Sequence, residues 1–267
     1  MKRIVWSTDI HLNFVEQSML DQYIGRLADA APDHVVISGD IAESNSVVDH
    51  LAELNDRLDC TISFVLGNHD FYYGSIAQVR DDVRRLCWQR KGLIYLSEGQ
   101  CVEIAEGVGM VGHDGWADAR IGDYERSMIM MNDYRLIDEL AGLGKQERWP
   151  VLKALGDEAA TALRRSLPPA LDRFAHVFCI THVPPLRGAC WYNGRISDDE
   201  WAPHFTCKAV GDVLLEITPQ YPQSDVTVLC GHTHSTGECH PLPNMRILTG
   251  GAEYGFPAVN QVFQVET

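Results

Sequence analysis

The chain has 267 residues, of which 45% are hydrophobic and 22% are charged; 22 Lys and Arg stand against 37 Asp and Glu, for a formal net charge of −15. A chain of this length can bury a sizeable core without disulfides, and its composition excludes a disordered chain, a collagen and a coiled coil. The negative charge disfavours a long nucleic acid as a partner, because the phosphate backbone is repelled. No apolar run approaches the roughly 20 residues of a membrane span.

The cysteines and the first residues favour a cytoplasmic protein. The eight cysteines are scattered without a Cys-x-x-Cys pair, and Cys179 and Cys230 lie inside apolar, strand-like runs. They are interpreted as reduced core residues. The N-terminal segment carries two cations but turns polar at Ser7, too soon for the apolar core of a signal peptide. We therefore expect no contact with a membrane. Nothing in the sequence indicates an oligomeric state.

The first part of the chain alternates short apolar runs with helical stripes. Strands are predicted at 3–7, 34–38 and 61–66, and helices at 19–27, 47–58 and 76–87. The unbroken apolar run 34–38 is typical of a strand buried on both faces. Three strand–helix units in succession predict crossover connections and a largely parallel sheet.

The pattern then changes. Short strands at 93–96, 101–104 and 108–112 resemble a β-meander, and the helical segment that follows ends at Pro168–Pro169. Residues 116–175 form this segment, with helices at 128–140 and 151–167. Later strands are predicted at 177–181, 226–230, 245–248 and 259–265, and a helix at 209–217.

This order predicts one α/β domain over residues 1–267, with a helical, cap-like insertion at about 116–175. Helices between successive strands, followed by antiparallel pairs, suggest two sheets packed face to face with helices outside. An ordinary doubly wound sheet is the alternative, because periodicity does not separate the two arrangements.

Polar side chains gather where the predicted strands stop. They are Asp9 and His11, Asp40, the run Asn68-His69-Asp70, His182, and the pair His232 and His234. In an open α/β sheet, ligands bind outside the carboxyl ends of the strands. We therefore expect five loops to deliver carboxylate, imidazole and amide groups to one edge.

These residue types suit two divalent metal ions. Imidazole and carboxylate together favour Mn, Fe, Zn, Co or Ni over Ca or Mg, and Mn is our first expectation. Because a carboxylate has two oxygens, Asp40 can bridge two cations. Each string alone is common in turns, whereas five of them at successive strand ends indicate a shared site.

In this combination the sequence resembles the calcineurin-like metallophosphoesterases. The matching strings are Asp9-Ile10-His11, Gly39-Asp40-Ile41-Ala42-Glu43, Gly67-Asn68-His69-Asp70, Thr181-His182 and Gly231-His232-Thr233-His234. The resemblance implies a four-layer αββα sandwich of two mixed sheets flanked by helices. It also implies one metal held by Asp9, His11, Asp40 and His234, and a second held by Asp40, Asn68, His182 and His232. His69 would then contact the substrate phosphate, and Asp70 would orient its imidazole.

The implied activity is dinuclear metal-dependent hydrolysis of phosphate esters by a metal-activated water. His11 in the Asp-x-His string favours a phosphodiesterase that acts on a small phosphodiester, since this histidine is common in the family's diesterases. Protein phosphatases of the superfamily carry Arg-Gly soon after Gly-Asp, and residues 41–45 lack it. A phosphomonoesterase and a catalytically silent metal-binding scaffold are the alternatives.

Substrate contacts are expected from loops near the metals. Trp116 and Arg120 of the insertion, and Arg187 and Tyr192 after His182, are candidates. A solvated cap with surface ion pairs, or ordinary loop packing, explains the same residues equally well. Tyr254 lies in a Gly-rich segment between two late strands, where turn chemistry is the preferred interpretation.

Overall fold

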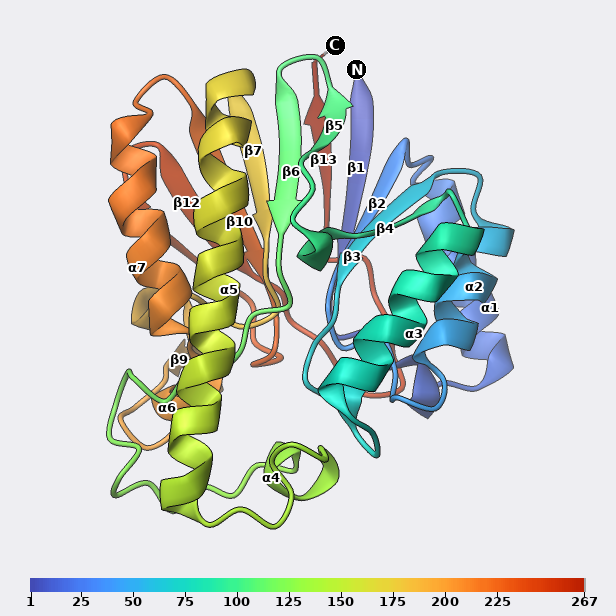
Figure 1. The fold of residues 1–267 in the computed structure, drawn as a ribbon. Coiled ribbons are helices and arrows are strands. Elements are labelled where there is room, and N and C mark those ends of the chain that lie inside the picture. Colours follow the sequence, from blue (N-terminus) through green and yellow to red (C-terminus); the bar gives the residue numbers. More distant parts are fainter. Residues whose placement is uncertain (267) are drawn as a thin grey trace.

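The computed structural model describes residues 1–266 and contains two β-sheets packed face to face, with helices on both outer sides (Figure 1). The strand order is β13-β1-β2-β3-β4 in the first sheet and β11-β12-β10-β7-β6-β5 in the second. The predicted αββα sandwich is therefore confirmed.

The first sheet contains β1 (Lys2–Ser7), β2 (His34–Ser38), β3 (Thr61–Val65), β4 (Leu93–Tyr95) and β13 (Gln261–Val265). The second contains β5 (Val102–Ala105), β6 (Val108–Gly112), β7 (His176–Ile180), β10 (Asp225–Cys230), β11 (Gly237–Leu242) and β12 (Met245–Thr249), and a separate small ribbon contains β8 (Trp191–Tyr192) and β9 (Arg195–Ile196). The helices are α1 (Gln17–Asp29), α2 (Val47–Arg57), α3 (Ile76–Gln89), α4 (Asp133–Leu136), α5 (Lys145–Arg173), α6 (Ala202–Phe205) and α7 (Lys208–Ile217).

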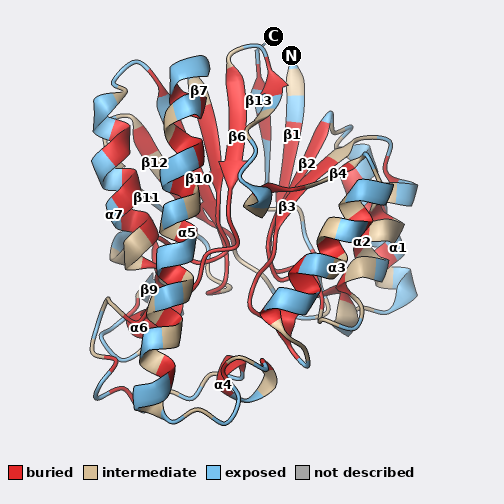
Figure 2. Cartoon of the chain, in the orientation of Figure 1, coloured by how far each residue is buried: buried red, intermediate tan, exposed pale blue. Residues whose placement is uncertain are grey.

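Alternating side chains on the strands build two kinds of core. In β1, Val5 packs toward the helices, whereas Ile4 and Trp6 pack between the sheets. Phe178 of β7 and Leu229 of β10 meet them from the second sheet. The central strands are therefore buried on both faces, as Figure 2 shows, and the helices expose only their outer sides.

The strands that carry the polar loops all run in one direction within their sheets. β1, β2, β3 and β4 pair in parallel, and so do β6, β7, β10 and β12. Their carboxyl ends consequently point to the same end of the molecule, opposite the two chain termini (Figure 1). This arrangement brings loops that are far apart in sequence to one edge.

The predicted β-meander is wrong. β4 pairs in parallel with β3 in the first sheet, whereas β5 and β6 form an antiparallel pair in the second. The chain crosses between the sheets after Gly99, whose left-handed backbone ends a short helical turn at 96–98. β11 is a further strand that the alternation did not reveal, because it is an edge strand whose side chains are only half-buried or exposed.

The insertion is organised differently from its prediction. The helix expected at 128–140 is reduced to α4, and α5 continues through Pro168 and Pro169 to Arg173. The prolines cannot donate to the carbonyls of Arg164 and Arg165, but both arginines are exposed, so water can satisfy those carbonyls. Residues 159–174 pack on the second sheet beside α7. The outer insertion, residues 116–156, extends past the carboxyl edge, where α6 also lies (Figure 1).

None of the helices in residues 1–266 is both long and apolar enough to cross a bilayer.

Candidate metal centre

The structure brings the predicted ligand residues to one edge of the sandwich. Asp9 and His11 follow β1, Asp40 follows β2, and Asn68 follows β3. The second sheet supplies the remaining imidazoles: His182 follows β7, and His232 and His234 follow β10. All seven side chains fall into two neighbouring clusters.

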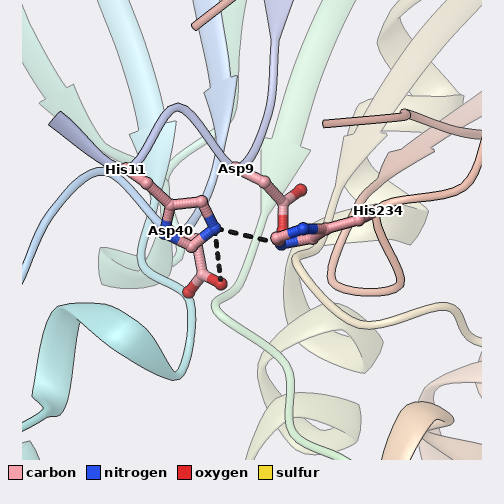
Figure 3. Close-up of side chains that lie close together, drawn as sticks. All are labelled: Asp9, His11, Asp40 and His234. Carbon is pink, nitrogen blue, oxygen red and sulfur yellow. Dashed lines mark hydrogen bonds and ion pairs between the residues drawn. The ribbon is translucent and has the colours of Figure 1, made fainter. Parts of the chain in front are cut away.

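The first cluster contains Asp9, His11, Asp40 and His234, whose donor atoms lie within 4.8 Å of one another. His11 Nε2 lies 3.0 Å from His234 Nε2 and 3.8 Å from Asp40 Oδ2. His234 Nε2 lies 3.4 Å from Asp9 Oδ1. Figure 3 shows these side chains pointing toward a common centre. Such a set of two imidazoles and two carboxylates matches the donor types that bind first-row divalent metals.

The second cluster contains Asp40, His182 and His232, with Asn68 between the two histidines. Asp40 Oδ2 lies 3.4 Å from His182 Nε2, and Asn68 Oδ1 lies 3.1 Å from the same nitrogen. His232 Nδ1 is 2.9 Å from Asn68 Oδ1. Asp40 therefore belongs to both clusters.

Outer hydrogen bonds direct lone pairs into this second cluster. His182 Nδ1 donates to the carbonyl of Ser38 at 2.9 Å, and His232 Nε2 donates to the carbonyl of His204 at 3.0 Å. The Asn68 amide donates to Asp133 Oδ1 at 2.9 Å. In the neutral rings, the remaining nitrogens of the histidines are acceptors that face the acceptor oxygen of Asn68. Acceptors that converge in this way need a proton or a metal ion between them, so the residues fit a bound metal.

The charges at the site also favour a bound cation. Burial raises the pKa of Asp40, but His182 and His69 outweigh it and hold that pKa well below its usual value. Burial lowers the pKa of His182, but the Asp40 carboxylate outweighs it and raises that pKa to about 10. Burial lowers the pKa of His11 to about 3. The site thus keeps ionised carboxylates that attract positive charge.

The backbone of these loops is strained. Asp9, His11, Asp40, His232 and His234 all have positive φ angles, between 42° and 70°. Only four other non-glycine residues among residues 1–266 share this conformation. Such residues are uncommon and persist where the surrounding structure holds them, often at functional sites.

Two glycines make room for the carboxylates. A Cβ at Gly67 would lie 2.1 Å from Asp40 Oδ1, and a Cβ at Gly231 would lie 1.9 Å from Asp9 Oδ2. No side chain fits at either position without displacing the carboxylate beside it. Gly67 therefore sets how closely two loops of the first sheet approach, and Gly231 sets the approach between loops of the two sheets.

His69 reaches the same centre from the end of β3. Its backbone N–H donates to Asp40 Oδ1 at 2.8 Å, and its ring lies 4.6 Å from that of His11. Its Nε2 is 3.3 Å from the Tyr254 hydroxyl. The side chain lines an open pocket beside the two clusters, together with Met131, Tyr192, Phe205, Thr233 and Tyr254.

The predicted role of Asp70 is wrong. Its carboxylate is fully buried and accepts hydrogen bonds from the backbone N–H groups of Ile41, Ala42 and Gly67, at 2.8–2.9 Å. No contact links it to the His69 imidazole, whose Nδ1 has no partner among the described residues. Asp70 instead ties the loop after β2 to the loop after β3.

Of the four predicted substrate residues, only Tyr192 lines the pocket. Trp116 is buried in the core against Phe71, so no substrate reaches it. Arg120 is engaged by Asp118 and Asp157, and Arg187 pairs with Asp199 outside the pocket. These three predictions are wrong, because Trp116 is part of the core and both arginines are already paired with carboxylates.

Three contributors were missed or underrated by sequence reasoning. Asp133 orients Asn68, the carbonyl of His204 holds His232, and Tyr254 packs its ring 4.5 Å from that of His11. Burial and the cations of Lys145 and Arg148 lower the pKa of His204 to about 3. Asp133 and His204 have no motif around them, so no local signal marks them. The Gly-rich segment around Tyr254 was the one available hint.

Comparison with known proteins agrees with this geometry. The model of the calcineurin-like phosphoesterase family matches residues 2–236. A dimetal phosphatase from Danio rerio superposes with a TM-score of 0.57 at 14% identity, covering 94% of this chain and 87% of that one. The phosphopantetheinyl hydrolase of Mycobacterium tuberculosis superposes with a TM-score of 0.61 at 15% identity, covering 94% and 89%. At these identities the two structures show a shared fold.

A sequence relative is an uncharacterized metallophosphoesterase from Campylobacter jejuni, 37% identical over 87 residues. That match covers 31% of this chain and only 23% of the relative's length. The family model, in contrast, spans all five ligand-bearing loops. The chain belongs to the calcineurin-like phosphoesterase family.

Proposed function

We propose that the protein is a dinuclear metal-dependent hydrolase of phosphate esters. Asp9, His11, Asp40 and His234 would hold one cation, and Asp40, Asn68, His182 and His232 the other. The observation that carries this assignment is the shared carboxylate: Asp40 Oδ2 lies 3.8 Å from a nitrogen of the first set and 3.4 Å from a nitrogen of the second. When bound, two such cations lower the pKa of a water and neutralise charge on phosphate oxygens.

His69 is the proposed catalytic side chain of the protein itself. Its backbone N–H is tied to Asp40, so the ring has a fixed distance from the metal ligands while one edge faces the pocket. A protonated imidazole there would stabilise charge on a phosphate oxygen or donate a proton to the leaving oxygen. The Tyr254 hydroxyl, 3.3 Å from Nε2, would orient that ring.

We further propose a small phosphodiester as the substrate. His11 supports this choice, because it completes the Asp-x-His string and lies fully buried in the first cluster. The pocket supports a small ligand: its volume is about 250 Å³, and it is walled by Met131, Tyr192 and Phe205. Met131 comes from the outer insertion, which is consistent with a single domain whose insertion caps the site. The net charge of −15 again argues against a long nucleic acid.

The metal and the location follow from donor chemistry. A donor set made of imidazole nitrogens and carboxylate or amide oxygens accepts Mn, Fe, Zn, Co or Ni, and we propose Mn. A cytoplasmic location is supported by the eight cysteines, none of which forms a disulfide and four of which are buried.

The test compares hydrolysis of bis(4-nitrophenyl) phosphate and 4-nitrophenyl phosphate with Mn²⁺ added. We expect turnover of both, with the diester the faster. A faster monoester would make the protein a phosphomonoesterase. Tight Mn²⁺ binding without hydrolysis of either compound would contradict the proposed activity and favour a metal-binding scaffold. His69→Ala protein serves as the control for a contaminating hydrolase.

A further inference from the structure

A second pocket lies between the outer insertion and His204 of α6, and we call it the insertion pocket. Its polar lining consists of Tyr124, Ser127, Tyr134, Lys145, Arg148 and His204, with the apolar segment 128–130 completing the wall. Its volume is about 160 Å³. No side chain in that lining is acidic, although the chain carries 37 Asp and Glu.

A wall about one residue thick separates this pocket from the metal centre. Met131 and Phe205 line the pocket at the metals, whereas their chain neighbours Met130 and His204 line the insertion pocket. The carbonyl of His204 accepts the hydrogen bond from His232 Nε2 at 3.0 Å. The two pockets therefore lie back to back.

Arg148 is a buried cation without an anionic partner. Only 4% of the residue is exposed, and it forms no ion pair within residues 1–266. Its Nε has no hydrogen-bond partner, and its Nη1 contacts only the sulfur of Met130, at 3.8 Å. The guanidinium stacks on the Tyr134 ring at 3.8 Å, a contact that does not satisfy the in-plane Nε–H.

Arg80 shows what this chain does with an arginine that has a purely structural role. It is 8% exposed, similar to Arg148, but its guanidinium bonds Asp114 at 3.0 Å and Glu158 at 2.7 Å. Buried charges are normally paired in this manner. The missing carboxylate at Arg148 therefore points to an anion that comes from outside the chain.

Lys145 adds a second positive charge to the pocket. Its Nζ donates to the carbonyls of Glu125 and Ser127, at 2.8 Å and 2.6 Å, and contacts no carboxylate among the described residues. The carboxylate that does touch the lining belongs to Glu200, whose Oε1 accepts from the backbone of Met128 at 3.3 Å. It contacts neither cation, so both positive charges remain unneutralised.

We propose that the insertion pocket binds a small oxyanion, of the phosphate or sulfate type, through Arg148 and Lys145. The planar fork of a guanidinium matches the oxygens of such an anion, and the ammonium adds charge beside it. The anion is either a second anionic group of a molecule that extends from the metal centre around this wall or a free anion. The site goes beyond the proposed hydrolase activity and does not depend on it.

The first test measures the thermal unfolding midpoint of the full-length protein during titration with sodium sulfate at constant ionic strength. We expect a saturable rise in the wild type and in Lys153→Gln, a matched control because Lys153 also lies on α5 over an aromatic ring, Trp149, but outside the pocket. In Arg148→Gln the sulfate concentration for half of the rise should increase at least tenfold. The general stabilisation by sulfate, and any sulfate at the metals, is common to all three proteins.

The same titration separates a ligand site from a structural arginine. Without added sulfate, Arg148→Gln should be at least as stable as the wild type, because it removes an uncompensated buried charge. Arg148→Lys, which keeps the charge, should bind sulfate with intermediate affinity. An identical sulfate response in wild type and Arg148→Gln would overturn the proposal, as would an Arg148→Gln protein that is less stable at every sulfate concentration.

A second test assigns the source of the anion. If it is part of the substrate, Arg148→Gln should raise KM at least tenfold for aryl phosphates that carry a second phosphate, and leave KM for simple aryl phosphates unchanged. If it is a free anion, both KM values should change equally. Either result supports the site, whereas unchanged KM values in both cases, with unchanged sulfate binding, would contradict it. An inactive wild type with normal sulfate binding would refute the hydrolase proposal alone.

Discussion

Two parts of the molecule meet at the metal centre in different ways. The loops after the strands supply every proposed donor atom, and five of their residues hold left-handed backbone to do so. The outer insertion and α6 supply no donor. Asp133 of the insertion and His204 of α6 instead hydrogen-bond Asn68 and His232 from behind, with ordinary helical backbone. For Asn68 and His232, the loops therefore supply the atom that would bind metal, whereas the insertion and α6 set which way it points.

The sharpest test of the loop region is Asp40→Ala. Because Asp40 contacts both clusters, its loss should remove both cations and lower kcat/KM by more than the roughly 10⁴-fold that a single acid–base group contributes. Metal content of the purified variant and diester hydrolysis measure the two effects. An Asp40→Ala protein that keeps two metals and its activity would contradict the shared-ligand assignment.

Next in size is His69→Ala. The ring lines the pocket and is outside both ligand clusters, so the variant should keep its metals while kcat falls about 10²- to 10⁴-fold. Metal analysis and steady-state kinetics on the same sample separate the roles. Loss of metal in step with activity would show instead that His69 maintains the centre.

The insertion is tested by Asp133→Asn. The Asn68 amide donates to Asp133, so the variant should turn that amide and weaken metal binding about 10- to 100-fold, with little change in fold stability. Metal titration followed by thermal unfolding provides the readouts, and exposed Asp138→Asn is the control. Unchanged metal affinity would mean that the insertion does not position the ligand.

The last prediction concerns stability at low pH rather than metal binding or turnover, and it rests on His204. Its pKa is about 3 in the fold, below the ordinary value of about 6.5 in the unfolded chain, so protonation favours unfolding. The stability it contributes is complete above pH 6.5 and is lost as the pH falls toward 3, by at most about 5 kcal/mol. His204→Gln should lose less stability over that window in urea melts of metal-free protein. The control is His240→Gln, because His240 is exposed. Equal acid sensitivity in His204→Gln and the wild type would show that His204 does not cause the loss of stability.

The same two regions differ in how far sequence reasoning reaches. Asp9, Asp40, Asn68 and His182 could be expected together because each stands where an apolar run stops, and parallel strands bring those ends to one edge. In the insertion that reasoning failed, since Trp116 and Arg120 were selected by residue type and their partners come from distant segments. Asp133 meets Asn68 across 65 positions of sequence, and Arg148 stands out only because burial and a missing partner coincide. Neither burial nor such pairing is written in a local pattern.

The most direct test of the central claim is the metal stoichiometry of the full-length protein, measured by equilibrium dialysis against Mn²⁺. Two cations that share Asp40 predict two Mn²⁺ per chain in the wild type and essentially none in Asp40→Ala. A single Mn²⁺ per chain, or two that survive the loss of Asp40, would contradict the account.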